Sequence, residues 1–252
     1  MTHLRAPVTA RLEVMPGVWQ VHAHAPEIAR AAQPGQFVMA LRQGSYDPYL
    51  RMAIPLHKIG AEHVALLLEE RSEAGLAIPA LDATLDILGP FGRGFALDPA
   101  VQHLLLVAQE MGVAPLLALA EQALAQNVKV TLFTLADRQE RLYPADLLPL
   151  EVEYRAFLVT NDQESAGFDR TLLEALPWTD GVCVAGSEAL HRRLGARIMS
   201  DPVRRRSGLV QVWWPGRIGC GMGLCLTCVA QTRQGPRRTC TDGPVFDLYD
   251  LI

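Results

Sequence analysis

The spacing of four cysteines constrains this chain more than any other feature. Cys220, Cys225 and Cys228 are separated by four and by two residues, and Cys240 follows after eleven more. This is the order of thiolates around a plant-type [2Fe–2S] cluster. Glycines between the cysteines tolerate positive φ and let the backbone curl around iron. The pattern predicts a [2Fe–2S] centre with Cys220, Cys225, Cys228 and Cys240 as its ligands.

Two other uses of these cysteines are less favoured. A structural zinc ion is usually held by two short C-x-x-C hooks, whereas this segment has only one pair at that spacing. Disulfides are disfavoured because nothing at the N-terminus resembles a signal peptide, and a C-x-x-C pair in a cytosolic chain favours metal or redox chemistry. The fifth cysteine, Cys183, lies in the apolar run VCVAG and is predicted to be an inert buried thiol.

Size and composition set the broad class. The 252 residues, 50% hydrophobic and 20% charged, are enough for two or three compact units with apolar cores. A net charge of −4 offers no attraction to nucleic acid, so no nucleic-acid partner is predicted. The most apolar region, residues 104–119, is too short and too polar to span a bilayer. We therefore predict a cytoplasmic protein with no membrane span.

Short runs of β-forming residues dominate the first part of the chain. Two runs over residues 8–24 flank the Pro16-Gly17 turn, and four more follow with turn residues between most of them: GQFVMALRQ, YLRMAIPLHKI, HVALLLEE and ATLDILG. Regular short strands of this kind indicate a small antiparallel barrel. We predict a β-barrel domain over residues 1–97.

The pattern changes near Asp98-Pro99 to alternating strands and helices. The apolar runs HLLLVAQ, VKVTLFTLA, FLVT and GVCVAG alternate with the helical segments APLLALAEQALAQ, TLLEALP and SEALHRRLGARIM. Such alternation is typical of a parallel sheet with crossover helices. We predict a nucleotide-binding type of α/β domain over residues 98–205, followed by a small cluster domain over residues 206–252 that includes VQVWW.

The order of barrel, α/β domain and cluster segment resembles one family. The most specific stretch is Cys220–Phe246, with CGMGLCLTC followed by CTDGPVF. Three more stretches are similar to the family's barrel motif, its GPLGxGF turn and the end of its nucleotide loop: Pro34–Phe37, Gly89–Phe95 and Gly112–Pro115. On these residues the chain is identified as a member of the electron-transfer subunits of class 1B dihydroorotate dehydrogenase, relatives of the ferredoxin–NADP reductases. The resemblance covers essentially the whole chain.

The resemblance also implies cofactors and a partner. FAD is expected in the barrel, NAD in the α/β domain, and FMN in a partner subunit that oxidises dihydroorotate to orotate, with the two subunits forming a heterotetramer. Electrons would pass from that FMN through the cluster to FAD and leave as a hydride to NAD. Because the cofactors carry this chemistry, no catalytic side chain is predicted, and the chain is an oxidoreductase subunit rather than a stand-alone catalyst.

Departures from the family pattern fall on the flavin site. The resemblance assigns flavin contacts to two stretches: Arg51, Met52, Ala53, Ile54 and Pro55, and Gly75 with Leu76. Met52 stands where the family has the flavin arginine. Pro55 and Leu76 stand where it has serine and threonine, so two hydroxyls and one backbone N–H are lost. Arg51 and Arg71 are the candidates to bind the pyrophosphate instead.

The dinucleotide loop departs from the pattern as well. The family's V-G-G-G-I-G-V-A-P corresponds here to VAQEMGVAP. Glycines in such a loop let the backbone approach a pyrophosphate at a helix N-terminus. Ala108, Gln109 and Glu110 restore side chains, and the Glu110 carboxylate puts negative charge where the phosphate would lie. Gly112 is retained as a predicted nucleotide contact.

Three functional hypotheses follow. The first is the family's electron-transfer subunit with FAD and NAD. The second is a cluster-bearing adaptor that has lost FAD or NAD binding and serves another redox partner. The third is a zinc-stapled assembly module on a former reductase fold. The surviving GPFGRGF turn favours FAD binding, and the altered loop disfavours NAD binding. Arg138 and Arg141 weakly favour a 2′-phosphate on any dinucleotide that binds.

Overall fold

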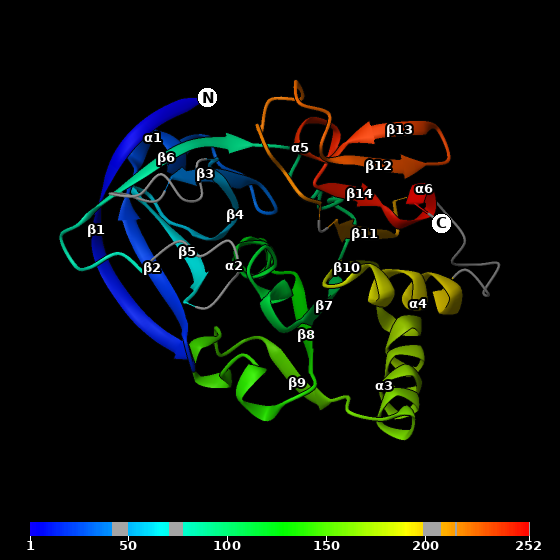
Figure 1. The fold of residues 1–252 in the computed structure, drawn as a ribbon. Coiled ribbons are helices and arrows are strands. Elements are labelled where there is room, and N and C mark those ends of the chain that lie inside the picture. Colours follow the sequence, from blue (N-terminus) through cyan, green and yellow to red (C-terminus); the bar gives the residue numbers. More distant parts are fainter. Residues whose placement is uncertain (42–49, 71–77, 199–207, 215, 252) are drawn as a thin grey trace.

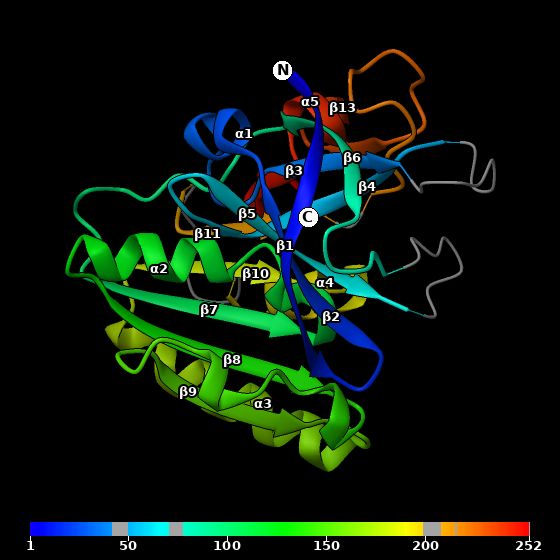
Figure 2. The same ribbon diagram turned by 90° about the vertical axis from the view of Figure 1, so that its left-hand side faces the viewer.

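The computed structural model describes residues 1–41, 50–70, 78–198, 208–214 and 216–251. An N-terminal barrel lies beside a helix-covered sheet, and the C-terminal segment lies next to both (Figure 1). Figure 2 shows the barrel and the C-terminal segment at the same end of the molecule. Within the described ranges, no helix is long and apolar enough to cross a membrane.

Six strands form the barrel: β1 (Thr2–Met15), β2 (Val18–His24), β3 (Phe37–Leu41), β4 (Met52–Ile59), β5 (His63–Glu69) and β6 (Thr84–Phe91). Neighbouring strands are antiparallel, and the closed order is β1-β2-β5-β4-β3-β6. Closure leaves no free sheet edge. A short helix, α1 (Pro26–Ala31), follows β2. The antiparallel barrel predicted from the short runs is confirmed.

The first strand is longer than its predicted run, which starts at Val8. Residues 2–7 of β1 pair with β6, and residues 8–15 pair with β2. The register shifts between Val8 and Ala10 and between Glu13 and Met15. Such irregularities bend a strand, so a single strand reaches two neighbours and closes the barrel.

A six-stranded sheet forms the second unit, in the order β14-β11-β10-β7-β8-β9. Five strands are parallel: β7 (His103–Gln109), β8 (Lys129–Ala136), β9 (Glu153–Leu158), β10 (Gly181–Ala185) and β11 (Val210–Trp213). The sixth, β14 (Val245–Asp247), is antiparallel to β11. The chain runs from β7 to β9 in one direction and then returns to β10 on the other side of β7. The crevice between the carboxyl ends of β7 and β10 is therefore the topological switch point.

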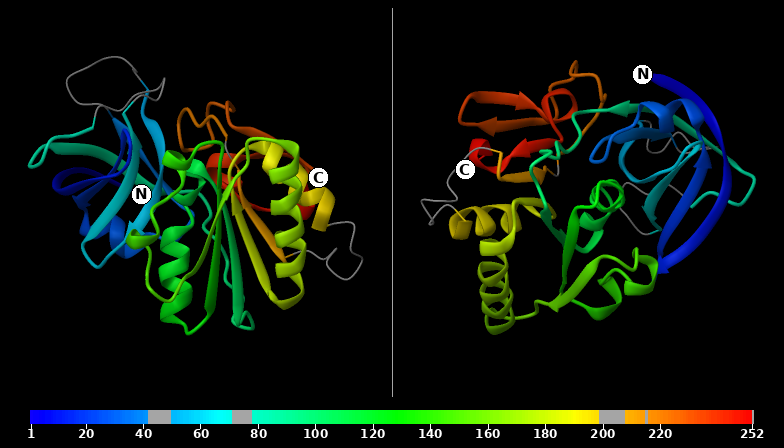
Figure 3. Two further views of the ribbon diagram at one scale, coloured as in Figure 1. Left: turned by 90° about the horizontal axis from the view of Figure 1, so that it is seen from below. Right: turned by 180° about the vertical axis from the view of Figure 1, so that it is seen from behind.

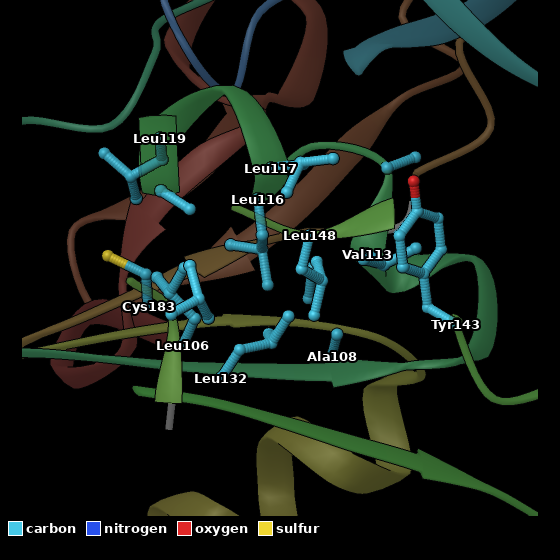
Figure 4. Close-up of a cluster of buried hydrophobic side chains, with 14 of the residues drawn as sticks. Leu106, Ala108, Val113, Leu116, Leu117, Leu119, Leu132, Tyr143, Leu148 and Cys183 are labelled. Carbon is cyan, nitrogen blue, oxygen red and sulfur yellow. The ribbon is translucent and has the colours of Figure 1, made fainter. Parts of the chain in front are cut away.

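Helices cover both faces of this sheet (Figure 3), as the α/β pattern predicts. The face toward the barrel carries α2 (Leu117–Ala125), and the other carries α3 (Asp162–Ala175) and α4 (Glu188–Ile198). Leu106 of β7 packs in the core under α2, whereas its neighbour Leu105 packs in the opposite core. This alternation explains the continuous apolar run. Figure 4 shows the core under α2, where Cys183 is buried as predicted and burial raises the pKa of its thiol.

Two elements start earlier than their predicted ranges. The strand β9 begins at Glu153, ahead of the run FLVT, and α3 begins at Asp162, well before TLLEALP. The Asn161 side chain caps α3 by accepting a hydrogen bond from Glu164 N–H at 2.9 Å. The first turn of α3 is polar, so no helical spacing of apolar residues shows where the helix begins. The described 3₁₀ helices are η1 (Glu110–Val113), η2 (Gln139–Arg141), η3 (Ala145–Leu147) and η4 (Leu176–Trp178).

The C-terminal segment divides between two structures. A hairpin separate from the sheet is formed by β12 (Val229–Thr232) and β13 (Gly235–Arg238), and α5 (Thr239–Asp242) follows it. The last helix, α6 (Leu248–Leu251), packs against the sheet through Leu248. By contrast, β11 and β14 complete the α/β sheet, although both fall in the predicted cluster domain. Every residue of β10 is buried, and β11 supplies the neighbour that such a strand needs. The division into 1–97, 98–205 and 206–252 stays a prediction.

Candidate functional site

The predicted metal ligands come from two segments that meet beside the barrel. Three lie in the loop of residues 219–228, here called the cysteine loop, and the fourth lies in α5: Cys220, Cys225, Cys228 and Cys240. Gly221 and Gly223 adopt positive φ of 74° and 77°. A Cβ on Gly221 would lie 3.0 Å from the Met39 side chain of β3. Glycine therefore permits both the curl of the loop and its close packing on the barrel.

Backbone donors in the loop point at the sulfurs. Met222 N–H donates to Cys220 Sγ at 3.4 Å, and Gly223 N–H donates to Cys240 Sγ at 3.2 Å. Partial burial raises the pKa of Cys220, but backbone N–H groups of the loop outweigh this effect and lower its pKa to about 6. Donors placed in this way stabilise the thiolate, which is the form that binds metal.

The four thiols form two pairs. Cys220 and Cys225 interact with each other, and so do Cys228 and Cys240, while Cys220 also acts on Cys240 across the two pairs. Burial raises the pKa of Cys240, and the neighbouring Cys228 raises it further. Within the described ranges, no three His, Cys, Asp or Glu side chains converge closely enough to hold one metal ion. The arrangement is thus two adjacent pairs rather than a single four-ligand cage.

Burial differs between the two pairs. Cys228 and Cys240 are only 4% and 1% exposed, whereas Cys225 is exposed and Cys220 is half-buried. The buried pair packs in an apolar cluster with side chains of β3 and β6: Phe37, Met39 and Phe91. One pair therefore faces the barrel, and the other reaches the surface.

A pocket of about 480 Å³ lies between the barrel and the sheet. The barrel contributes Pro55 and Leu67, and the loops at the carboxyl ends of β7 and β10 form much of the remaining wall. Trp213, at the end of β11, also lines the pocket, and its indole N–H donates to Gly35 O at 2.9 Å. The pocket opens at the topological switch point, where sheets of this kind bind ligands. Sequence reasoning missed this role of Trp213.

The predicted flavin residues of β4 divide between its two faces. Met52 and Ile54 pack with the barrel core. Ala53 packs toward the cysteine pair, and Pro55 lines the pocket. This division follows from strand alternation, which sends successive side chains to opposite faces. The predicted contacts Gly75 and Leu76, and the alternative Arg71, lie outside the described residues.

Arg51, the remaining predicted flavin residue, is engaged with the barrel. Its Nη1 lies 2.7 Å from Asp86 Oδ1 and donates to the backbone oxygens of Met39 and Asp86 at 3.4 and 3.3 Å. Burial raises the pKa of Asp86, but hydrogen bonds from Arg51 and His3 lower it overall. These contacts hold the guanidinium against β3 and β6.

The loop after β7, residues 109–113, is here called the nucleotide loop. A Cβ on Gly112 would lie only 2.1 Å from Ala185 O, so this position tolerates no side chain. Gln109 Oε1 accepts hydrogen bonds from both the Ser187 N–H at 3.0 Å and the Ser187 hydroxyl at 2.7 Å. The sequence shows a side chain at 109, but not that it closes on the loop after β10.

The Glu110 carboxylate, predicted to repel a phosphate, has a cationic partner. Arg141 Nη2 lies 3.3 Å from Glu110 Oε2, and Arg141 Nη1 lies 2.5 Å from Glu69 Oε1 of the barrel. Burial lowers the pKa of Arg141, but the two carboxylates raise it overall. Arg141 is thus committed to two carboxylates, which speaks against its predicted preference for a 2′-phosphate. Arg138 pairs weakly with its own neighbours at the surface.

Comparisons with known proteins agree with the cysteine geometry. Residues 216–252 match the family model of the iron-sulfur cluster binding domain of dihydroorotate dehydrogenase B. The electron transfer subunit of dihydroorotate dehydrogenase B (NAD(+)) from Bacillus caldolyticus is 33% identical over 236 residues, which is 87% of each chain. The subunit of the same name from Desulforamulus reducens is 28% identical over 262 residues, covering 98% of this chain and 97% of that protein.

Solved structures share the fold at lower identity. An NADH-dependent reduced ferredoxin-NADP oxidoreductase has a TM-score of 0.79 at 16% identity, covering 99% of this chain and 90% of that one. Phthalate dioxygenase reductase has a TM-score of 0.66 at 15% identity, covering 92% and 87%. The barrel followed by a parallel sheet is therefore the architecture of known reductases.

Proposed function

This chain belongs to the family of the electron transfer subunits of dihydroorotate dehydrogenase B, and from this premise we propose that it holds a [2Fe–2S] cluster and FAD beside a dihydroorotate-oxidising subunit. That partner would carry FMN, and the two subunits would form a heterotetramer. The two cysteine pairs are the observation that carries the proposal. A cytoplasmic location remains a prediction.

The cysteine site fits an iron–sulfur cluster in its donor set. Four thiols from two segments, arranged as two pairs, suit two neighbouring irons. A single tetrahedral zinc would need four donors around one point, which the pairs do not offer. When bound, the cluster would accept and release one electron at a time. The chain's own part is to supply thiolates, to direct N–H groups at the sulfurs and to bury one pair against the barrel.

The pocket between barrel and sheet fits the flat ring of a flavin. Pro55, Leu67, Met111 and Trp213 contribute apolar surface to its walls. The Trp213 indole is fixed by its hydrogen bond to Gly35 O. Bound FAD would join one-electron transfer to two-electron chemistry. We propose that Pro55, Leu67, Met111 and Trp213 contact the flavin ring. Gly112 lets the nucleotide loop lie against the end of β10, since a side chain there would meet Ala185 O.

A second candidate function is an adaptor that has lost dinucleotide binding. The relatives' name includes NAD(+), but the nucleotide loop of this chain is occupied by its own side chains. The hydrogen bonds of Gln109 to Ser187 and the ion pair of Glu110 with Arg141 favour this candidate. In this candidate function the chain still holds the cluster and still belongs to the family, and only the electron acceptor differs.

Metal and cofactor analysis of the anaerobically purified chain tests the proposed function. We expect about two irons and two acid-labile sulfides per chain, with FAD released by acid. Cys228→Ala should lose iron and sulfide together, because it removes one member of the buried pair. Cys183→Ala is the matched control and should retain both, since Cys183 lies in the α/β core. Bound zinc without sulfide would support the assembly-module hypothesis and contradict the proposal.

A further inference from the structure

The switch-point crevice of this sheet is bridged by the chain itself. Gln109 ends β7, and Ser187 follows β10 after Gly186, so their hydrogen bonds cross the crevice from one strand end to the other. In open parallel sheets this crevice is where a dinucleotide phosphate meets the backbone and a helix N-terminus. The groups that would receive a phosphate are therefore in contact with a side chain of the same molecule.

Gln109 satisfies the donors at the start of α4. Its Oε1 accepts from the Ser187 N–H and hydroxyl, and the Ser187 oxygen in turn accepts from Leu190 N–H at 3.2 Å. A Cβ on Gly186 would lie 2.7 Å from the Cβ of Gln109. Glycine at 186 thus lets the glutamine close down on the turn. A phosphate could use these donors only after displacing the Gln109 side chain.

Glu110 is the second side chain of the nucleotide loop that would oppose a phosphate. Its φ of 47° lies in the left-handed region, which favours glycine. The backbone therefore keeps a glycine-like path while carrying a carboxylate. Arg141 binds this carboxylate and Glu69 together, with side chains 17%, 31% and 28% exposed respectively. Two carboxylates and one guanidinium carry a net negative charge and join the barrel to the nucleotide loop, and the Glu110 carboxylate of this group lines the pocket.

An alternative explanation is that the contacts of Gln109 and Glu110 are ordinary packing within the loop, and that a bound dinucleotide displaces them. Displacement would break both hydrogen bonds of Gln109 and bring a pyrophosphate toward the Glu69–Arg141–Glu110 group. Breaking the hydrogen bonds disfavours binding because their free energy is lost. Bringing the pyrophosphate close to the carboxylates disfavours binding because like charges repel. Gln109 and Glu110 therefore oppose a dinucleotide in different ways, the first by occupying the Ser187 donors and the second by its charge.

We propose that Gln109 and Glu110 are specificity-determining residues that close this chain to NAD(H) and NADP(H). Gln109 takes the place of a phosphate oxygen at Ser187, and Glu110, held by Arg141, repels the pyrophosphate. The exclusion rests on the contacts and charges of Gln109, Glu110 and Arg141. Its consequence, that electrons are exchanged with protein-bound redox centres instead of a dinucleotide, rests on the proposed function.

Calorimetric titration of the full cluster-loaded chain with NADH and with NAD⁺ tests the exclusion. We expect no saturable binding up to about 1 mM, the upper end of common KM values. The double variant Gln109→Gly with Glu110→Gly should gain binding by at least about tenfold, since it removes both obstacles. Gln139→Gly with Glu140→Gly is the matched control. It removes the same two residue types from two exposed positions of η2, leaves Arg141 in place and should bind no better than the wild type.

Two results would overturn the proposal: micromolar binding by the wild type, or a folded double variant that binds no better than the wild type. Glu110→Gly alone relieves the left-handed strain, so it provides a second variant if the double one does not fold. A severalfold gain is expected from it. Iron and sulfide are measured on the same preparations. Their loss would count against the proposed function, whereas dinucleotide binding with the cluster intact would count only against the exclusion.

Discussion

Two glycines of this chain act in opposite ways at the residue level. A Cβ on Gly112 would meet Ala185 O at 2.1 Å, and a backbone oxygen cannot turn aside as a side chain can. Gly167, in the middle of α3, has nothing within 4 Å of its Cβ position. Gly112 therefore lets the nucleotide loop lie against the end of β10, whereas Gly167 only weakens its helix.

We expect Gly112→Ala to lower the free energy of unfolding by about 2 to 3 kcal/mol, because the methyl group must push the loop away from β10. Gly167→Ala is the matched control and should raise it by about 0.5 to 1 kcal/mol. Urea unfolding followed by circular dichroism measures both values. A Gly112→Ala protein as stable as the wild type would contradict the close approach.

At the level of elements, β4 joins the barrel to the α2 side of the sheet. His57 in β4 is fully buried between Ala114 O and the Tyr143 hydroxyl, each 3.2 Å from a ring nitrogen. A carbonyl only accepts, so Nδ1–H donates to Ala114 and Nε2 accepts from Tyr143. The next residue, Lys58, pairs with Glu121 of α2 at 3.2 Å. Neighbouring side chains of one strand thus hold both the nucleotide-loop side and α2 against the barrel.

This contact makes stability depend on pH. Burial lowers the pKa of His57 to about 3 from 6.5, against a smaller opposing effect of the Ala114 hydrogen bond. The unfolded chain takes up a proton near pH 6.5 that the folded chain does not, so stability falls as pH drops below that value. From pH 7 to pH 5 the loss is about 2 kcal/mol. Burial also lowers the pKa of His191, to about 4, which adds a slope of the same sign.

Urea unfolding of the wild type and of His57→Gln at pH 7 and pH 5 isolates the His57 share. The variant keeps a polar side chain but does not titrate. The stability advantage of the wild type over the variant should therefore shrink by about 2 kcal/mol at the lower pH. His191 is common to both proteins and cancels. An advantage that is equal at both values would mean that His57 is not held neutral.

Across the whole molecule, the cysteine site lies between the barrel and an apolar surface. Four side chains in or next to the cysteine loop are 40% to 78% exposed: Met222, Leu224, Leu226 and Val229. Exposed apolar groups gathered in one segment mark an interaction surface. The exposed Cys225 lies among them, and the buried pair lies behind. A redox partner seated here would approach the exposed Cys225 directly.

We expect Met222→Lys with Leu224→Lys to weaken binding of the dihydroorotate-oxidising subunit by about tenfold or more, because charges would be buried in an apolar contact. Leu150→Lys is the matched control. Leu150 is 99% exposed and belongs to the α/β part. Calorimetric titration measures the affinity, with iron content checked in each variant. Unchanged affinity with the iron retained would place the partner on another face.

Local patterns were sufficient wherever the physical cause lies within a short stretch of chain. Glycine at the turns and strand periodicity predicted the antiparallel barrel and the helix-covered parallel sheet, which are confirmed. The metal-ligand set inferred from the cysteine spacing stays a prediction. The confirmed burial of Cys183 follows from the same kind of local apolar run. The long β1 and the early start of α3 were missed, because a strand shared between two neighbours and a polar first turn leave no periodic mark.

The remaining features depend on residues far apart in the sequence. Gln109 and Ser187 are separated by 78 positions, and Arg141 and Glu69 by 72. No local pattern can show that their side chains meet. Likewise, β11 and β14 join the sheet because the buried β10 needs a neighbour, which is a requirement of packing and not of their own composition. The sequence alone therefore established which cofactor chemistry the chain is built for. Long-range packing established how the nucleotide site is closed, because only folding brings the closing side chains together.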